Sequence, residues 1–193
     1  STQVGRWESF EVDHRTYFLT TLANGSLQAL MPLSLNFRMS DDYKPRFGRT
    51  VIRGDLWKGF HQDMGNVAKE GGIAFANGKK PVRLIKQLIK WANNTRDAVV
   101  LDFFAGSGTT AHAVLQANAE DSGNRRFIMV QLDEVPDPKS EAAKEGYRSI
   151  AELSRERIRR AGASIVSGTG YSGQRLDTGF RVFRLDSANV KAW

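Results

Sequence analysis

An apolar strand followed by a glycine turn and a small-residue helix is the feature that most constrains the fold of this chain. Residues 98–103 read Ala-Val-Val-Leu-Asp-Phe, and residues 105–108 read Ala-Gly-Ser-Gly. We expect a fully buried strand over 98–103, a helix from about Thr109 to Ala119, and a second strand over 127–132. This order is typical of α/β proteins that hold a nucleotide-like ligand at the carboxyl ends of parallel strands. It predicts a doubly wound sheet with a ligand site at the turn.

The turn itself narrows the kind of ligand. Gly106 and Gly108 carry no Cβ, so the backbone can approach a ligand closely. Ser107 and Thr109 place hydroxyls beside the first N–H groups of the helix, an environment that suits a carboxylate. A phosphate-binding P-loop would end in Lys and Ser or Thr, and a dinucleotide motif would need glycine at Ala111. We therefore expect a ligand with a carboxylate or similar group and a ribose.

The elements around this segment are expected to be mainly helical. Pro81 suits the first turn of a helix that carries Leu84, Ile85, Leu88 and Ile89 on one face. A long polar helix is expected from about Ser140 to Ala161, ended by Gly162. The arginines at 155, 157, 159 and 160 favour a solvated face on that helix, with contact to DNA or another subunit as the alternative.

The two ends of the chain are less regular in sequence. The first 78 residues are rich in aromatics and glycine turns, and short strands are expected over 17–20 and 50–52. Near the other end, residues 180–185 alternate apolar and basic side chains, which predicts a half-exposed strand. We find no internal repeat.

The chain is basic, with 28 Lys and Arg against 21 Asp and Glu and a net charge of +7, which favours polyanionic partners. Cations and aromatics mix over residues 44–49 and again near Trp57, as on surfaces that contact phosphates and stack on bases. A solvated loop with Phe47 and Trp57 packed beneath it is the alternative. The chain has no cysteine, no signal-peptide pattern and no long apolar run, which favours a cytoplasmic location.

The string from Asp102 to Thr110, Asp-Phe-Phe-Ala-Gly-Ser-Gly-Thr-Thr, resembles the cofactor motif of the DNA methyltransferases that modify adenine N6 or cytosine N4. The resemblance covers roughly residues 71–193. The segments 126–134, 149–160 and 179–187 make the chain most similar to the modification subunits of type III restriction-modification systems, which are permuted methyltransferases. The resemblance implies a partial Rossmann-like methyltransferase fold that binds S-adenosylmethionine. It also implies an irregular N-terminal region and a C-terminal β appendage. It also implies methylation of adenine N6, with cytosine N4 as the alternative.

The resemblance implies roles for individual residues. Asp102 would accept from the ammonium of the methionine end, and the segment Phe104, Ala105, Gly106, Ser107, Gly108 and Thr109 would cradle that end. Phe75, Lys80 and Pro81 would line the same pocket. Gln131 stands where many relatives have an acidic residue that binds the ribose hydroxyls, with Asp133 or Glu134 as substitutes.

One part of the family pattern is missing. The family transfers methyl with an Asp/Asn/Ser-Pro-Pro-Tyr/Phe tetrapeptide, whereas this chain contains no Pro-Pro pair, so no catalytic residue is assigned. We expect the chain to be the C-terminal part of a longer enzyme and not to methylate by itself. A chain that supplies a cofactor pocket to a separate catalytic subunit, and a non-catalytic DNA-binding or assembly module, are the alternatives.

The expected organisation has three parts. Residues 1–70 would be a remnant of the target-recognition region, 71–162 the cofactor-binding subdomain and 163–193 the strand appendage. The candidates for contact with double-stranded DNA are Arg46, Arg49, Arg53 and Lys58. The resemblance also implies a modification dimer and a helicase-nuclease partner. His14, His61 and His112 lack carboxylates at ligand spacing, so surface or packing roles are expected and no metal site.

Overall fold

A computed structural model describes residues 4–30, 37–50, 57, 59–75, 78–93, 95–168 and 176–185. The chain divides into two compact units, Ser1–His61 and Gln62–Trp193. The predicted strand at 50–52 lies outside the described residues except for Thr50. Of the four predicted DNA contacts, Arg53 and Lys58 also lie outside them.

The first unit is built from antiparallel strands, so the expectation of an irregular N-terminal region was wrong for the part that is described. The strands are β1 (Glu8–Val12), β2 (Arg15–Thr21), β3 (Leu27–Leu30), β4 (Phe37–Met39) and β5 (Phe47–Arg49). The first three form one sheet in the order β1-β2-β3, and β4 pairs with β5. The predicted strand at 17–20 is confirmed within β2. Gly25 turns the chain between β2 and β3 with a left-handed φ of 80°.

The second unit contains the predicted order of helix, strand, glycine turn, helix and strand. Its elements are the 3-10 helices η1 (Phe60–Gly65, whose first two residues belong to the first unit) and η2 (Val67–Gly72), then α2 (Val82–Ala92), β6 (Val99–Asp102), α3 (Thr109–Asp121), β7 (Arg126–Met129), α4 (Glu141–Lys144) and α5 (Ile150–Gly168). β6 and β7 pair in parallel, from Val99 beside Arg126 to Asp102 beside Met129. Within the described residues, no helix combines the length and apolarity that a membrane crossing requires.

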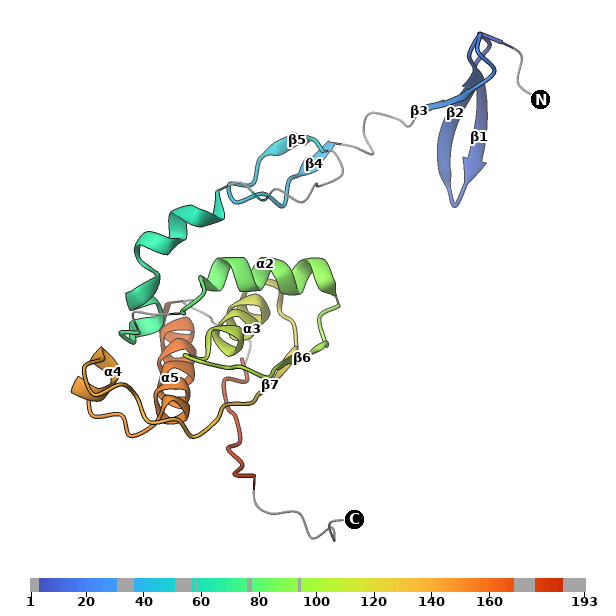
Figure 1. Ribbon diagram of the computed structural model, residues 1–193. Coiled ribbons are helices and arrows are strands. Elements are labelled where there is room, and N and C mark those ends of the chain that lie inside the picture. The colour runs from blue at the N-terminus through green and yellow to red at the C-terminus, as the bar shows by residue number, and fades with distance from the viewer. Residues whose placement is uncertain are drawn as a thin grey trace, which may run out of the picture. The chain divides into compact units, whose positions relative to one another are not determined.

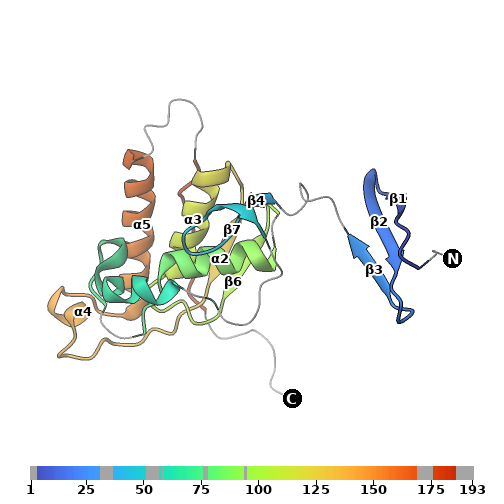
Figure 2. The ribbon, with the colours of Figure 1, turned by 90° about the horizontal axis from the view of Figure 1, so that it is seen from above.

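Helix α3 is the centre of this unit. It packs against α2 and α5 and against one face of the β6–β7 sheet (Figures 1 and 2). Its Ala113 and Val114 meet Val82 and Ile89 of α2, with Val100 and Phe127 of the strands beside them. Its Ala111 and Leu115 meet Ile158 of α5. The run of small side chains that marked this helix in the sequence lets the neighbouring helices approach its backbone closely.

The second face of the β6–β7 sheet is open, which corrects the expectation of a fully buried strand. Val99 and Leu101 of β6 are 50% and 48% exposed, and Ile128 of β7 is 52% exposed. Side chains alternate across a strand, so each strand buries one face only. The described residues therefore form a mixed α/β unit with a two-stranded parallel sheet, and the larger doubly wound sheet is not present among them.

The predicted long helix over 140–161 is two helices, α4 and α5, so this expectation was wrong. Gly146 turns the chain between them with φ of 83°, and Ser149 then caps α5 by accepting from the N–H of Glu152 at 3.2 Å. The Glu152 carboxylate accepts from the N–H of Arg148 at 2.8 Å. This Ser-x-x-Glu arrangement closely resembles a capping box, a signature of a helix start that is already visible in the sequence.

Two expectations about the end of the chain were also wrong. Helix α5 continues through Gly162 to Gly168. A Cβ at Gly162 would lie 2.9 Å from the Cβ of Thr178, so this glycine allows a close approach of the chain and does not end the helix. Residues 180–185 form no strand. Phe180 instead packs on Phe127, with ring centroids 6.4 Å apart.

His112 is a titratable group on the inner side of α3. Its Nδ1 is buried without a hydrogen-bond partner among the described residues. Burial, together with the charges of Arg157, Lys79 and Lys86, lowers its pKa from 6.5 to about 4. The imidazole is therefore neutral in the folded protein at neutral pH.

The two faces of the sheet give a prediction about stability. Leu115→Ala removes a side chain that is 2% exposed and should lower the free energy of unfolding by about 2–5 kcal/mol. Leu101→Ala is the matched control on the open face, and it should lower the free energy of unfolding by about 1 kcal/mol or less. Urea unfolding followed by helical circular dichroism reports on the second unit, where the described α-helices lie. Equal losses in the two variants would contradict the open face.

The depressed pKa of His112 predicts a pH dependence of stability. The unfolded chain takes up a proton near pH 6.5 and the folded chain only near pH 4, so the stabilisation is complete above pH 6.5 and is lost as the pH falls towards 4. The loss should reach at most about 3 kcal/mol. The measurement is the difference in unfolding free energy between the wild type and His112→Gln at pH 7, 6 and 5. As the pH falls, the unfolding free energy of the wild type should decrease relative to that of the variant. A difference that stays constant from pH 7 to pH 5 would show that His112 is not the titrating group.

Candidate functional site

The ends of β6 and β7 meet at one edge of the sheet, and the glycine segment lies there. The pairing continues past both strands, because Val130 N–H donates to the Asp102 carbonyl at 2.8 Å and Ala105 N–H donates to the Val130 carbonyl at 3.0 Å. The Asp102 carboxylate accepts from Phe104 N–H at 3.0 Å and from the Thr110 hydroxyl at 2.6 Å. It is half-buried and keeps lone pairs for a further donor.

Gln131 joins the glycine segment from the tip of β7. Its Oε1 accepts from Gly106 N–H at 2.7 Å. Because an N–H donor faces this atom, it must be the amide oxygen and not the nitrogen. The NH₂ group of Gln131 is left as the donor that can face a ligand, which allows a hydrogen bond to a hydroxyl oxygen.

The hydroxyls of the glycine segment point into the protein. Ser107 and Thr109 are 3% and 6% exposed, and both accept from Nη1 of Arg157, at 2.8 and 2.6 Å. Between them, Gly108 has φ of 79°, and a Cβ there would lie 2.7 Å from the Ser154 hydroxyl. The surface that this turn offers to a ligand is therefore its main chain, together with the first N–H groups of α3.

Arg157 is fully buried and belongs to a compact charged cluster. Its Nη2 lies 3.4 Å from Oε2 of Glu70, and the same oxygen accepts from Val82 N–H at 3.0 Å. Burial lowers the pKa of Arg157 to about 10, although Glu70 opposes the shift. The guanidinium therefore remains charged at neutral pH. The expectation that Arg157 belongs to a solvated helix face was wrong.

Lys79 is a second buried cation in this cluster. Its Nζ donates to the carbonyls of Ala68 and Ile73, at 3.1 and 2.7 Å. Burial and the charge of Arg157 lower its pKa to about 8, against an opposing effect of Glu70. Lys79 thus ties the residues just before α2 to the carbonyl oxygens of Ala68 and Ile73, in and just after η2.

The three candidates that precede the motif do not gather at the glycine segment through any described contact. Phe75 packs against Ile73 and Leu153 in another part of the core. Lys80 is exposed, and Pro81 is fully buried just before α2. Phe104, by contrast, is 89% exposed beside Asp102, so its ring is available for contact.

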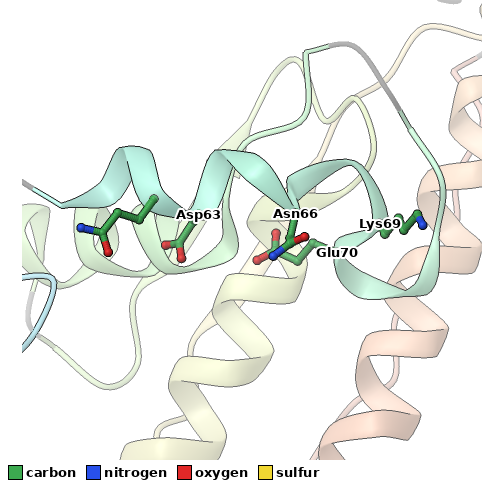
Figure 3. A pocket seen from close by; sticks show the side chains of 5 residues that line it. Asp63, Asn66, Lys69 and Glu70 are labelled. Carbon is green, nitrogen blue, oxygen red and sulfur yellow. The ribbon is translucent and has the colours of Figure 1, made fainter.

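A hollow of ≈ 440 Å³ lies along η1 and η2 and not along the glycine segment. Its lining residues are Gln62, Asp63, Asn66, Lys69 and Glu70. Figure 3 shows Asp63, Asn66 and Glu70 along one side of this helical stretch, whereas Lys69 points away. The hollow borders the charged cluster only through Glu70.

The two described DNA-contact candidates lie in the first unit. Arg46 and Arg49 are exposed, at and next to β5, and Phe47 between them is 69% exposed. The ring of Phe47 meets that of Phe37 edge to face, with centroids 6.1 Å apart. Cations and an exposed aromatic thus share this hairpin, and the alternative in which Phe47 is packed beneath a loop was wrong.

The sequence interpretation missed Arg157 and Glu70. A signal for Arg157 was present, because it falls on the stripe formed by Ile150, Leu153, Ile158 and Ala161, at the helical spacing that faces the core. An arginine on such a stripe must be paired inside the protein. Glu70 gave no comparable signal, because its partners are distant in sequence.

Comparison with known proteins identifies the family. The model of the DNA methylase family matches residues 28–136. The StyLTI Mod subunit, from a type III restriction-modification enzyme of Salmonella typhimurium, is 48% identical over 106 residues. The corresponding EcoPI subunit of Escherichia phage P1 is 44% identical over 121 residues, and the EcoP15I subunit of Escherichia coli is 42% identical over 111 residues.

These alignments cover 55%, 62% and 58% of this chain but only 16%, 18% and 15% of the respective relatives. The matched family region contains the glycine segment, Asp102 and Gln131. Since the family model matches more than half of the sequence, the chain belongs to the DNA methylase family.

Proposed function

We propose that the chain is the cofactor-binding portion of a site-specific DNA methyltransferase that modifies adenine N6 in a restriction-modification system. Cytosine N4 is the alternative target. The observation that carries this proposal is the edge where Asp102, the Gly106–Thr109 turn and Gln131 are joined by hydrogen bonds. The similarity to three type III Mod subunits supports a role in a restriction-modification system, and adenine N6 is the target that the family resemblance implies.

The residues at this edge fit S-adenosylmethionine. The Asp102 carboxylate is half-buried and suits the ammonium of the methionine end, and the main chain of the turn suits its carboxylate. The Gln131 amide donates to a ribose hydroxyl, with Asp133 and Glu134, both exposed, as substitutes. Phe104 covers the ligand with its exposed ring. When bound, the cofactor supplies an activated methyl group.

Phe75, Lys80 and Pro81 complete the proposed cofactor pocket from the segment before α2. Lys80 is the exposed member of this group and offers an ammonium to the ligand. Pro81 is buried just before α2, and Phe75 is partly buried against Ile73 and Leu153, so their proposed role is to fix the backbone that enters α2.

Methyl transfer itself needs a Pro-Pro tetrapeptide that this sequence does not contain. We infer that the catalytic residues belong to another segment of a longer protein or to another subunit. A dimer and a helicase-nuclease subunit are the partners we propose for the complete enzyme. In this arrangement the chain would bind the cofactor weakly and would not methylate alone.

We propose double-stranded DNA as the macromolecular partner, contacted through Arg46 and Arg49 on the β4–β5 hairpin. Their guanidinium groups are exposed and suit phosphate oxygens. Arg53 and Lys58, which lie outside the described residues, extend the same basic stretch of sequence.

The role of Asp102 gives a prediction for cofactor binding. Asp102→Asn keeps an oxygen for Phe104 N–H and an amide that can donate to the Thr110 hydroxyl, so it removes the charge with little change of the turn. Affinity for S-adenosylmethionine should fall about tenfold to a hundredfold, the usual value of a charge-assisted hydrogen bond. Asp102→Ala should abolish binding. Calorimetric titration measures both, with Asp97→Asn, an exposed residue before β6, as the control. Unchanged affinity in both Asp102 variants would refute the pocket.

The role of the hairpin arginines gives a prediction for DNA. At low salt, Arg46→Ser with Arg49→Ser should weaken duplex binding and reduce the slope of log K against log salt by about 2, or one for each lost phosphate contact. The control pair is Arg181→Ser with Arg184→Ser, which removes the same charge from exposed positions in the second unit. Fluorescence anisotropy with a labelled duplex measures the slopes. The same reduction in both pairs would indicate that binding follows net charge and not the hairpin.

A further inference from the structure

Three side chains hold the glycine segment, and one of them lies outside the residues 28–136 that the family model matches. Asp102 holds it from β6 and Gln131 from the tip of β7. The third contact is a hydrogen bond from the guanidinium of Arg157, a residue of α5 that lies 48 residues beyond Thr109 in the sequence. We propose that Arg157, oriented by Glu70, is the positioning residue that fixes the backbone of the Gly106–Thr109 turn in the shape that receives the cofactor. This inference rests on the proposed cofactor site.

Arg157 contacts the residues on both sides of Gly108, where the turn has a left-handed backbone. Nη1 donates to the Ser107 hydroxyl at 2.8 Å and to the Thr109 hydroxyl at 2.6 Å, and Gly108 lies between these residues. Both hydroxyls are buried, so a lost donor could not be replaced by bulk water without opening the core. One guanidinium nitrogen therefore sets the side-chain direction on both sides of the left-handed glycine.

Helix α5 supports the same turn by packing. A Cβ at Gly108 would meet Ser154 Oγ at 2.7 Å and Ile158 Cγ1 at 3.4 Å. Ser154 and Ile158 lie on the same face of α5 as Arg157, at helical spacing. Gly108 thus packs against this face of α5, and Ser107 and Thr109 on either side of it are hydrogen-bonded to the same face.

Glu70 gives the guanidinium its orientation. Oε2 of Glu70 lies 3.4 Å from Nη2 of Arg157 and accepts from Val82 N–H, so the carboxylate is itself fixed at the start of α2. Gly71 lets the arginine lie against the backbone, because a Cβ there would be 2.6 Å from Nε of Arg157. The chain of contacts from α2 through Glu70 and Arg157 to Ser107 physically joins the segment before α2 to the glycine turn.

A role in overall stability alone would affect the whole unit, whereas a positioning role acts on the turn. The two can be separated, because the turn contains glycines whose amide signals report on local backbone shape. Gly106 and Gly108 lie in the turn; Gly146, elsewhere in the second unit, reports on a general loss of its structure, and Gly25 is a reference in the first unit.

The central variant is Arg157→Lys, which keeps the positive charge but replaces the planar fork by a single ammonium. Spectra of the ¹⁵N-glycine-labelled chain without ligand should show shifted amide signals for Gly106 and Gly108 and unchanged signals for Gly25 and Gly146. Calorimetry should show affinity for S-adenosylmethionine and S-adenosylhomocysteine reduced about tenfold, as for loss of a buried hydrogen bond to a charged group. Arg159→Lys, on the exposed side of the same helix, should change neither readout.

A double-mutant cycle tests the contact itself. Ser107→Ala removes one acceptor, and its combination with Arg157→Lys should weaken binding no more than the larger single change does, since both remove the same hydrogen bond. If Arg157→Lys does not fold, Glu70→Gln replaces it: the amide still accepts from Val82 N–H but loses the charge that orients Arg157. The same two glycine signals should move, by less.

The outcomes separate this inference from the proposed function. No binding of either cofactor form by the wild type would refute the cofactor site as a property of this chain, whereas the glycine signals would still test the hold on the turn. Unmoved signals of Gly106 and Gly108 in Arg157→Lys, or additive effects in the cycle, would overturn the role of Arg157. A shift of Gly146 as large as those of Gly106 and Gly108 would also overturn it, because it would indicate a general loss of structure in the second unit.

Discussion

The parallel pairing of β6 with β7 is the constraint on which the candidate site depends. A parallel pair places both carboxyl ends at one edge, and here the register sets Asp102 beside Met129. The next hydrogen bonds, from Val130 to Asp102 and from Ala105 to Val130, carry the pairing into the glycine segment. Gln131 follows Val130 just beyond the end of β7, and this places it where its side chain reaches Gly106. The backbone register, more than any side chain, brings the proposed methionine and ribose contacts together.

The same pair of strands leaves an unusual surface. Parallel strands are normally covered on both faces, whereas Val99, Leu101 and Ile128 are about half exposed on the face away from α3. Burial of one face stabilises the unit through α3, and the other face contributes little. The strands retain apolar residues on both faces, a pattern suited to a sheet that is covered on both sides.

The sequence predicted the elements whose signals are local. The amphipathic helix after Pro81, the strand before Asp102 and the small-residue helix were all predicted, because period and turn chemistry determine them. The break between α4 and α5 could have been predicted from Ser149 and Glu152, but the continuous polar composition hid it. Two other features could not have been predicted, because both depend on residues distant in sequence. They are the close packing of Gly162 on Thr178 and the pairing of Arg157 with Glu70. Tertiary contacts decide such positions and local pattern does not.

The charges around the glycine turn form a polar arrangement that one side chain alone could not provide. Arg157 and Lys79 are buried cations on the inner side, and His112 beside them stays neutral mainly because burial lowers its pKa, with the two positive charges adding to the effect. The start of α3 adds the positive end of its helix dipole at the turn. The Asp102 carboxylate supplies the negative charge on the strand side. The proposed cofactor would match this polarity, with the carboxylate of its methionine end towards the turn and the ammonium towards Asp102. In the proposed site Arg157 would contribute twice, through hydrogen bonds that shape the turn and through a positive charge that favours a carboxylate bound at the turn.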